Sequence, residues 1–261
     1  MENGTITYTQ LLREDLGIFR VTPDDGVPDF KAGQFLNLGL PLESKIVNRA
    51  YSIASSPENR DYFEFVIRWV RKPLPGRLTS LLFNAKEGDK ISWTKPAGTL
   101  TINDTLPNGE KDTRRIVCIG GGTGLAPFIS FAQHLHDTND KREIVILHGA
   151  SYVDELSYKQ LLTDLENESI AKGADKWNFK YRAAISRPQE WTNRAWHGYK
   201  GRIEQFLRTS DNGKSPLEEL VGEKITADNT MFYVCGWQGT IDGVMDYLKA
   251  KNFVTEKNKR E

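Results

Sequence analysis

Four glycines lie within five positions of the chain, in the run Gly120-Gly121-Gly122-Thr123-Gly124. Glycines let a backbone turn sharply and approach a ligand with no Cβ in the way. The run ends where a helical pattern begins, and the unpaired N–H groups and partial positive charge of a helix start suit a pyrophosphate. A glycine-rich corner that merely tightens the turn is the weaker interpretation. The candidate nucleotide-binding residues of this run are Gly122, Thr123, Gly124 and Pro127.

The segments around this run alternate between strand and helix patterns. Apolar residues predict a strand at Arg115–Ile119 and a helix at about 126–137. Further along, the pattern predicts strands at 143–148, 179–186 and 231–235, and helices at 156–171 and 239–251. Strands that alternate with helices imply a parallel sheet covered on both faces. We therefore expect residues 113–261 to form an α/β parallel-sheet nucleotide-binding domain.

The chain before residue 113 has a different pattern of apolar and polar residues. Apolar residues alternate in short runs such as Phe19–Val21 and Phe63–Ile67, which are separated by clusters of Gly, Pro and Asp. This pattern is typical of a small antiparallel barrel, here interrupted by one short helix around Leu78–Leu82. The stretch Asn103–Thr113 has little apolar content and is predicted to be a linker or surface loop. We expect residues 1–112 to form an N-terminal antiparallel β-barrel domain.

The composition excludes several classes of protein. The 35 basic and 35 acidic residues balance, whereas a nucleic-acid binder is expected to show a basic surplus. The longest apolar stretch is far too short to span a bilayer, and the first residues lack the pattern of a signal peptide. Cys118 and Cys235 belong to no metal-binding cluster, so we expect no metal and two reduced thiols, with a disulfide as the less supported alternative. The resulting expectation is a cytoplasmic protein.

An ordered set of motifs resembles the ferredoxin–NADP reductase family, most closely its bacterial type. The segment Arg49-Ala50-Tyr51-Ser52 is similar to that family's flavin motif, and Ala32-Gly33-Gln34-Phe35 precedes it at the matching distance. Further matching segments follow in the family's order over nearly the whole chain: Gly76–Ser80, Lys95–Leu100, Gly122–Phe128 and Cys235-Gly236. One such segment is a weak signal, but the ordered set is specific. The resemblance implies FAD on the barrel domain and NADP on the α/β domain.

The resemblance assigns roles to residues on the flavin side. Tyr51 would stack on the isoalloxazine, the Ser52 hydroxyl would reach flavin N5, and Arg49 would donate two hydrogen bonds to the pyrophosphate. Taken alone, Tyr51 would be an ordinary strand aromatic, Arg49 a solvated edge-strand charge and Ser52 a turn residue. The other residues implied on this side are Ala50, Ile67, Arg68, Trp69, Val70, Arg77, Leu78 and Thr79, with a barrel-surface role as an equal alternative for Trp69.

The resemblance also implies residues that bind NADP. Arg187 and Arg202 match the family positions that bind the 2′-phosphate, which requires localised positive charge; two ordinary surface arginines are the alternative. Ser151 stands where relatives of this type often have arginine, so we expect a softened preference for NADPH. Cys235 and Gly236 resemble the family's pair near the nicotinamide. A small buried residue that ends a central strand is an equally good interpretation of Cys235.

The resemblance implies an FAD-dependent enzyme that transfers electrons between NADPH and a ferredoxin or flavodoxin, with Tyr51, Ser52 and Cys235 as its catalytic residues. One alternative is an NAD(P)H-dependent flavin or quinone reductase, and another is the reductase component of a multi-subunit oxygenase. A non-catalytic flavin-binding module is a remote third.

At the end of the chain, we expect Phe253 to pack beneath the last helix and the final ten residues to form a solvated tail. The sequence leaves the oligomeric state open.

Overall fold

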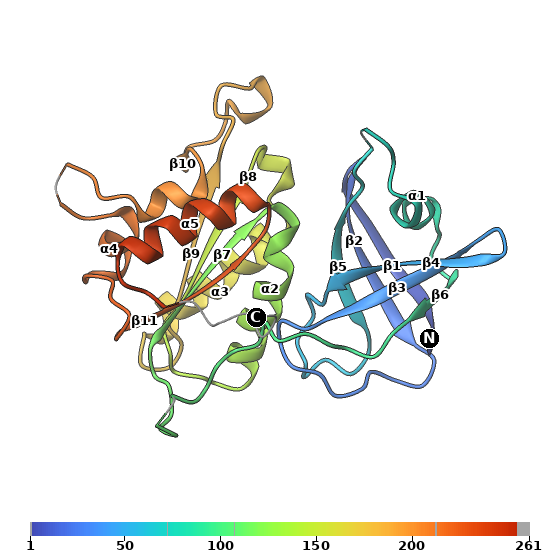
Figure 1. Ribbon diagram of the computed structural model, residues 1–261, viewed down its shortest axis with the longest axis horizontal. Coiled ribbons are helices and arrows are strands. Elements are labelled where there is room, and N and C mark those ends of the chain that lie inside the picture. The colour runs from blue at the N-terminus through green and yellow to red at the C-terminus, as the bar shows by residue number, and fades with distance from the viewer. Residues whose placement is uncertain (1, 72, 107, 212, 255–261) are drawn as a thin grey trace. The chain divides into compact units, whose positions relative to one another are not determined.

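The computed structural model describes residues 2–71, 73–106, 108–211 and 213–254. The chain forms two compact units, whose elements are labelled in Figure 1. The first unit contains the described residues of Met1–Asn103, Thr123–Asp140 and Ser157–Lys159. The second unit contains those of Asp104–Gly122, Lys141–Leu156 and Gln160–Glu261.

A six-stranded antiparallel sheet makes up most of the first unit. Its strands are β1 (Glu2–Arg13), β2 (Leu16–Pro23), β3 (Phe35–Leu42), β4 (Lys45–Ser52), β5 (Phe63–Arg68) and β6 (Lys90–Trp93). They are ordered β4-β3-β6-β1-β2-β5, so β4 and β5 form the two ends of the hydrogen-bonded ladder. The predicted antiparallel architecture is confirmed. The strands β1 and β4 were not predicted, because few of their side chains are buried and their few apolar residues are interspersed with polar and charged ones.

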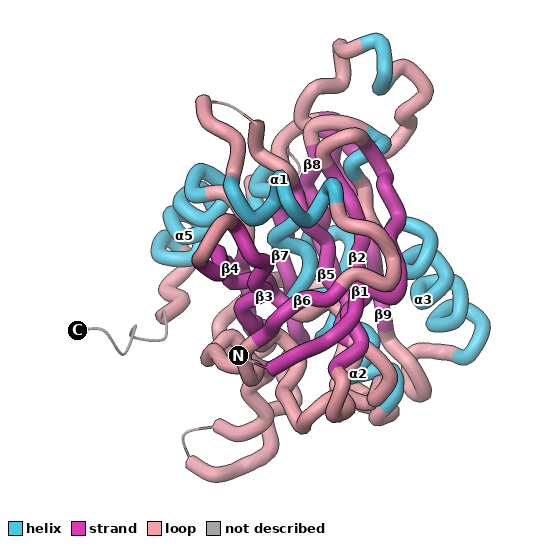
Figure 2. The backbone as a smooth tube through the Cα atoms, turned by 90° about the vertical axis from the view of Figure 1, so that its right-hand side faces the viewer, coloured by secondary structure: helices cyan, strands magenta, loops and turns pink. Residues whose placement is uncertain are grey.

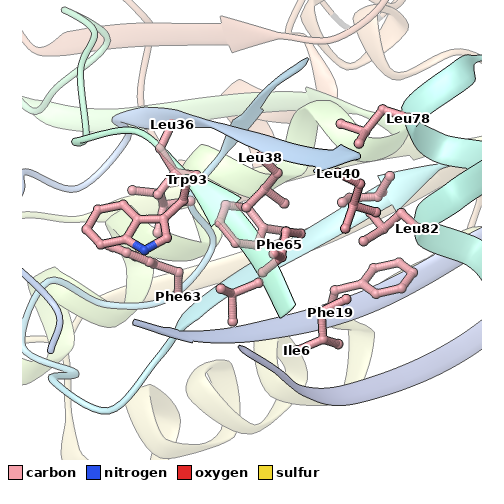
Figure 3. Packing of buried hydrophobic residues seen from close by; sticks show 14 residues of the cluster. Ile6, Phe19, Leu36, Leu38, Leu40, Phe63, Phe65, Leu78, Leu82 and Trp93 are labelled. Carbon is pink, nitrogen blue, oxygen red and sulfur yellow. The ribbon is translucent and has the colours of Figure 1, made fainter. Parts of the chain in front are cut away.

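Aromatic and branched side chains fill the core of this unit (Figure 3). Phe63 lies edge-on to Trp93 with ring centroids 5.3 Å apart, a geometry that aromatic pairs favour. The helix α1 (Arg77–Asn84) adds Leu78 and Leu82 to the same core, and both point toward Leu40 in Figure 3. The predicted short helix is confirmed. Its buried leucines hold the start of α1 in a fixed place on the barrel.

Gly33 shows why a glycine is required in the segment that leads into β3. Its backbone has a φ of 89°, in the left-handed region that favours glycine. A Cβ at this position would lie 2.0 Å from the carbonyl oxygen of Leu100 and 2.5 Å from the ring of Phe131. A backbone oxygen cannot move aside as a flexible side chain can. Any side chain here would therefore displace the chain that enters β3.

Two later segments of the chain form part of the first unit. In α2 (Ala126–Asp137), the Ser130 hydroxyl donates to the carbonyl of Ser55 at 2.7 Å. The Tyr158 hydroxyl donates to the Glu64 carboxylate at 2.9 Å. Tyr158 has a φ of 58°, which no helical residue adopts, so the next helix, α3 (Lys159–Lys172), begins at Lys159 and not at the predicted residue 156.

A five-stranded parallel sheet forms the centre of the second unit. Its strands are β7 (Arg115–Gly121), β8 (Ile144–Ala150), β9 (Phe179–Ile185), β10 (Tyr199–Lys200) and β11 (Thr230–Cys235), in the order β10-β9-β8-β7-β11. Figure 2 shows α3 on one side of this sheet and α5 (Gln238–Ala250) on the other. The helix α5 buries Val244 and Leu248 in a core that also contains Leu217 of α4 (Pro216–Val221). The predicted α/β parallel sheet is confirmed.

The segment predicted to be a linker is more ordered than expected. Thr105 and Lys111 form an antiparallel bridge. Asp112 is fully buried, and its carboxylate lies 2.6 Å from the guanidinium of Arg114. Hydrogen bonds from Arg114 lower the pKa of Asp112. The polar residues that led us to expect a loop at Asn103–Thr113 therefore include Asp112, whose carboxylate is in a buried ion pair, as well as residues exposed at the surface.

The end of the described chain packs under α5. The Phe253 ring lies edge-on to Phe232 of β11 with centroids 5.2 Å apart, and the Phe253 N–H donates to the carbonyl of Leu248 at 3.0 Å. The expected packing of Phe253 is confirmed. Residues 255–261 of the predicted tail lie outside the described residues. Within the part of the chain that is described, no helix is both long and apolar enough to cross a membrane.

Candidate cofactor-binding site

The predicted flavin residues lie on the two edge strands of the antiparallel sheet. Arg49–Ser52 end β4, and Ile67 and Arg68 end β5. An edge strand has one row of backbone N–H and C=O groups that no neighbouring strand pairs. Such groups are available to bind a ligand that lies along the strand.

Backbone alternation shows which groups face away from the sheet. The N–H of Ile53 donates to the Gln34 carbonyl at 2.9 Å, on the β3 side, and the N–H of Trp69 donates to the Asp15 carbonyl at 2.8 Å, on the β2 side. Successive residues of an antiparallel strand direct their backbone groups to opposite sides. The backbone groups of Ser52 and Arg68 therefore point away from the paired strands, where they are available to a cofactor.

The side chains of the β4 segment suit different parts of a flavin nucleotide. Tyr51 packs partly against the barrel core, while Arg49 and Ala50 are exposed and Ser52 is half-buried. Burial raises the pKa of Tyr51 to about 12, although the nearby charge of Arg49 opposes the shift. Tyr51 therefore stays a neutral phenol at physiological pH. Arg49 donates to the Asn48 carbonyl at 2.8 Å, which leaves most of its five N–H donors for a ligand.

The residues at the end of β5 differ in what they offer a ligand. Ile67 is only 1% exposed and lies in the barrel core, so it has only its backbone to offer. Arg68 pairs with Asp15 at 2.9 Å. The Trp69 ring contacts Phe83, and the guanidinium of Arg71 lies 4.2 Å from its centre. Val70 is 58% exposed. Ile67, Arg68, Trp69 and Val70 therefore follow one another along the strand edge, but their side chains are not equally available to contact a cofactor.

The start of α1 fits a phosphate group. Its N-cap is Gly76, which has no side chain to accept from the first-turn N–H groups. The hydroxyls of Thr79 and Ser80 donate back to the Gly76 carbonyl at 3.1 and 2.8 Å, so neither caps the helix start. Arg77 is exposed beside it, and Leu78 anchors the turn in the core. Unpaired N–H groups, the helix dipole and an arginine together favour an anion.

The predicted nucleotide residues of the second unit follow the carboxyl ends of the parallel strands. Ala150 pairs with Ile185 and Ala184 with Tyr199, so β8, β9 and β10 end side by side. Gly120 pairs with Cys235, which places the ends of β7 and β11 at the same edge. Nucleotides bind at this edge in open α/β sheets. The residues that follow these strand ends are Gly122, Ser151, Arg187, Arg202 and Gly236.

The glycine run at the end of β7 leaves space for a ligand. Gly122 has a φ of 56°, and a Cβ there would meet no atom within 4 Å. Gly236 is packed instead: its φ is 148°, and a Cβ would lie 2.9 Å from the Gly121 nitrogen. A 3₁₀ turn at Gly122–Leu125, which includes Thr123 and Gly124, leads into α2, with Pro127 in the first turn and no side-chain cap. These features fit a pyrophosphate.

Two arginines at this edge have different partners. Arg187 donates to the Tyr152 hydroxyl at 2.7 Å, and its guanidinium lies 5.3 Å from the centre of that ring. Among the described residues, Arg187 has no carboxylate partner. Arg202 forms an ion pair with Glu204, whose side chain is buried. The positive charge of Arg187 is therefore less neutralised than that of Arg202. The Ser151 N–H donates to Glu155 at 3.1 Å.

Comparison with known proteins identifies the family. One family model, the oxidoreductase FAD-binding domain, matches residues 4–102, and another, the oxidoreductase NAD-binding domain, matches residues 118–246. A ferredoxin–NADP reductase of Azotobacter vinelandii is 32% identical over 221 residues, which cover 84% of this chain and 78% of that protein. The chain belongs to the ferredoxin–NADP reductase family. The predicted family is thereby confirmed.

One solved structure and one further relative are also similar to this chain. A ferredoxin NADP+ reductase from Neisseria gonorrhoeae, solved with bound FAD and NADP, has a TM-score of 0.78 at 23% identity and covers 98% of this chain and 94% of that one. At this identity the likeness shows the fold alone. The reductase component of propane 2-monooxygenase from Mycolicibacterium goodii is 28% identical over 244 residues, which span 91% of this chain but 60% of that protein.

Sequence reasoning missed several residues of the reductase that shape the nucleotide edge. Tyr152, Glu155, Asn193 and Glu204 all hold predicted residues in place. None belongs to a motif. Each forms a hydrogen bond or ion pair either with a residue distant along the chain or with a neighbour in the same turn. Glu155 accepts from the backbone N–H of Tyr152 at 3.3 Å, three positions earlier, but Tyr152 is not an N-cap residue type, so the sequence carries no capping-box signal. The described residues contain no group of three or more side chains that could hold a metal.

His148 of the reductase makes stability depend on pH. It is fully buried on β8, and burial lowers its pKa from 6.5 to about 3. The unfolded chain therefore binds a proton below pH 6.5 that the native protein cannot bind. Stability should be intact above pH 6.5 and should fall as pH falls toward 3, by up to about 1.4 kcal/mol per pH unit.

Replacing His148 by glutamine should flatten that slope between pH 6.5 and 5. Urea unfolding of both proteins at pH 7, 6 and 5 measures it. Buried carboxylates with lowered pKa values, such as Asp112, titrate at lower pH and contribute little in this window. Equal slopes for the two proteins would contradict the assignment.

Proposed function

We propose that this chain is an FAD-dependent enzyme that transfers electrons between NADPH and a ferredoxin or flavodoxin. The observation that carries the proposal is the gathering of Gly122, Ser151, Arg187 and Arg202 at the carboxyl edge of one sheet. The other unit carries a flavin motif on an edge strand beside an uncapped helix start. The 32% identity to a ferredoxin–NADP reductase supports the same function.

The proposed roles on the flavin side follow from exposure and charge. Arg49 and Arg77 hold the FAD pyrophosphate together with the N–H groups of Leu78 and Thr79 at the start of α1. Tyr51 offers its ring to the isoalloxazine, and the Ser52 hydroxyl hydrogen-bonds near N5. The edge of the sheet from Ile67 to Val70 lies along the rest of the cofactor. When bound, FAD would supply the chemistry that takes a hydride from NADPH and releases electrons one at a time, and these residues would hold and orient it.

The proposed roles on the nucleotide side use the ends of the parallel strands. The turn from Gly122 to Pro127 binds the NADPH pyrophosphate, and Arg187, Arg202 and Ser151 bind the 2′-phosphate. Gly236 lets β11 end close to Gly121. Burial raises the pKa of Cys235, so its side chain stays an uncharged thiol. An uncharged, half-buried thiol helps to exclude water from the nicotinamide.

Three further statements belong to the same proposal. We place the boundary between the FAD-binding and NADP-binding domains at residues 112 and 113, as the change of sequence pattern predicts. We place the protein in the cytoplasm, where soluble electron carriers are available to it. Its partner is a one-electron carrier protein, and the balance of 35 basic and 35 acidic residues gives no support to a nucleic-acid partner.

A second candidate is the reductase component of an oxygenase. The observation that favours it is the relative from Mycolicibacterium goodii, which matches 91% of this chain. This chain spans only 60% of that protein, so the match leaves part of that reductase component without a counterpart. The ferredoxin–NADP reductase from Azotobacter vinelandii matches with higher identity and more of its own length, and therefore favours the first candidate.

Steady-state oxidation of NADPH with different electron acceptors tests the proposal. We expect the purified protein to reduce at least one ferredoxin or flavodoxin with a higher kcat/KM than it reduces free flavin or a soluble quinone. Fast reduction of free flavin or quinone, with no activity toward any carrier protein, would instead support a partner-independent reductase. No NADPH oxidation with any acceptor, ferricyanide included, would overturn the assignment as an enzyme.

A further inference from the structure

Asn193 connects the two segments that follow β8 and β9. It ends the 3₁₀ turn Trp191–Asn193 and is only 2% exposed. Its side-chain NH₂ donates to the carbonyl of Ser151 at 3.0 Å and to the carbonyl of Arg187 at 2.8 Å. Its side-chain oxygen accepts from the N–H of Val153 at 2.9 Å. One buried amide thus joins three backbone groups from two separate loops.

These loops contain two of the residues proposed to bind the 2′-phosphate. Ser151 follows β8 and Arg187 follows β9, and both are fixed at their backbones by the same side chain. Both N–H donors of the Asn193 amide and its oxygen are used. No other residue type of similar size offers two donors and one acceptor in this arrangement. The distance between the Ser151 and Arg187 backbones therefore depends on Asn193.

Arg187 depends on such support more than Arg202 does. Arg202 is held by the buried carboxylate of Glu204, and Arg187 has no carboxylate partner among the described residues. The hydroxyl of Tyr152 accepts from Arg187, and Tyr152 lies in the β8 loop that Asn193 also holds. If the two loops separate, Arg187 is no longer held at a fixed distance from Tyr152 and Ser151.

We propose that Asn193 is a positioning residue for NADPH selectivity, which acts by fixing Arg187 and Ser151 at one distance. The inference rests on the proposed binding of the 2′-phosphate at this edge. Asn193 does not itself contact the nucleotide. Asn193 holds the charge of Arg187 and the hydroxyl of Ser151 at a fixed separation. The 2′-phosphate of NADPH binds to both groups at once, whereas the free 2′-hydroxyl of NADH does not.

The test measures NADPH and NADH oxidation in the FAD-loaded enzyme with ferricyanide as acceptor. Because ferricyanide replaces the natural carrier, the result does not depend on which protein accepts the electrons. Asn193→Ala should raise KM for NADPH by about fivefold to twentyfold, change KM for NADH less than about twofold, and leave kcat nearly unchanged. Thr192→Ala, at an exposed position of the same turn, is the matched control and should change neither KM.

Asn193→Asp serves as the second variant in case the alanine variant does not fold. The carboxylate keeps the volume and the acceptor for Val153 but loses both donors, so it should also lower the selectivity for NADPH. In an Arg187→Ala background, either change at Asn193 should have less than about half its effect on the ratio of the two KM values. An equal rise in both KM values, an unchanged ratio in a folded variant, or full additivity with Arg187→Ala would overturn the proposal.

Discussion

Replacing Arg49 by alanine should weaken FAD binding by about tenfold to several hundredfold. A hydrogen bond to a charged group contributes about 1.5–3 kcal/mol, and an arginine fork makes two of them to a pyrophosphate. Arg49 is exposed on an edge strand, where no carboxylate is paired with it among the described residues. Fluorescence titration of the apoprotein with FAD measures the dissociation constant, and the chromophore content after gel filtration gives an independent reading.

A second arginine of the same unit provides the control for Arg49. Arg60 is exposed, pairs with Asp29 at 2.8 Å and belongs to none of the motif segments. Arg60→Ala should leave the FAD affinity unchanged, whereas Arg77→Ala, at the uncapped start of α1, should weaken it in the same direction as Arg49→Ala. An Arg49→Ala protein that binds FAD as tightly as the unmodified protein would remove Arg49 from the pyrophosphate site.

Replacing Arg187 by alanine should raise KM for NADPH by about tenfold to a hundredfold and leave KM for NADH nearly untouched. The 2′-phosphate is the only group that distinguishes the two cofactors, so a residue that binds it affects only NADPH. Arg202→Ala should act in the same direction but less strongly, because Glu204 already neutralises part of the Arg202 charge. Initial rates at varied NADPH and NADH give both constants for each variant.

The size of this preference depends on Ser151. A serine hydroxyl donates a hydrogen bond to a phosphate but adds no charge, so Ser151→Arg should increase the preference for NADPH. Equal changes in the two KM values for Arg187→Ala would show that Arg187 does not bind the 2′-phosphate. A larger effect at Arg202 than at Arg187 would show that the ion pair with Glu204 does not reduce the contribution of Arg202.

Much of the fold was predictable because its signals are local. The apolar run at Arg115–Ile119, the glycines after it and the helix at Ala126–Asp137 lie within one stretch of sequence, and the structure places all three as predicted. The strands β1 and β4 were not predictable in this way. Few of their side chains are buried, and they are strands because neighbouring strands supply their hydrogen-bond partners.

The same distinction applies to the candidate site. Arg49, Tyr51 and Arg187 stand in motifs whose order along the chain indicates their roles. Asn193 stands in no motif, and its importance comes from three hydrogen bonds to residues six to forty-two positions away. For Ile67, the motif indicated a cofactor contact but not that its side chain is buried in the core. Long-range contacts of this kind become visible only in the folded chain.

Anaerobic mixing of the purified holoprotein with NADPH is the most direct test of the central claim, that one chain binds FAD and reduces it with NADPH. We expect the visible absorbance of the flavin to bleach, and we expect the chromophore released on denaturation to be FAD. In the Arg187→Ala variant, the flavin should bleach more slowly than in the unmodified protein at low NADPH concentration. At high NADPH concentration, the variant should bleach as fast as the unmodified protein. A flavin that NADPH does not bleach, or the release of FMN alone, would contradict the account.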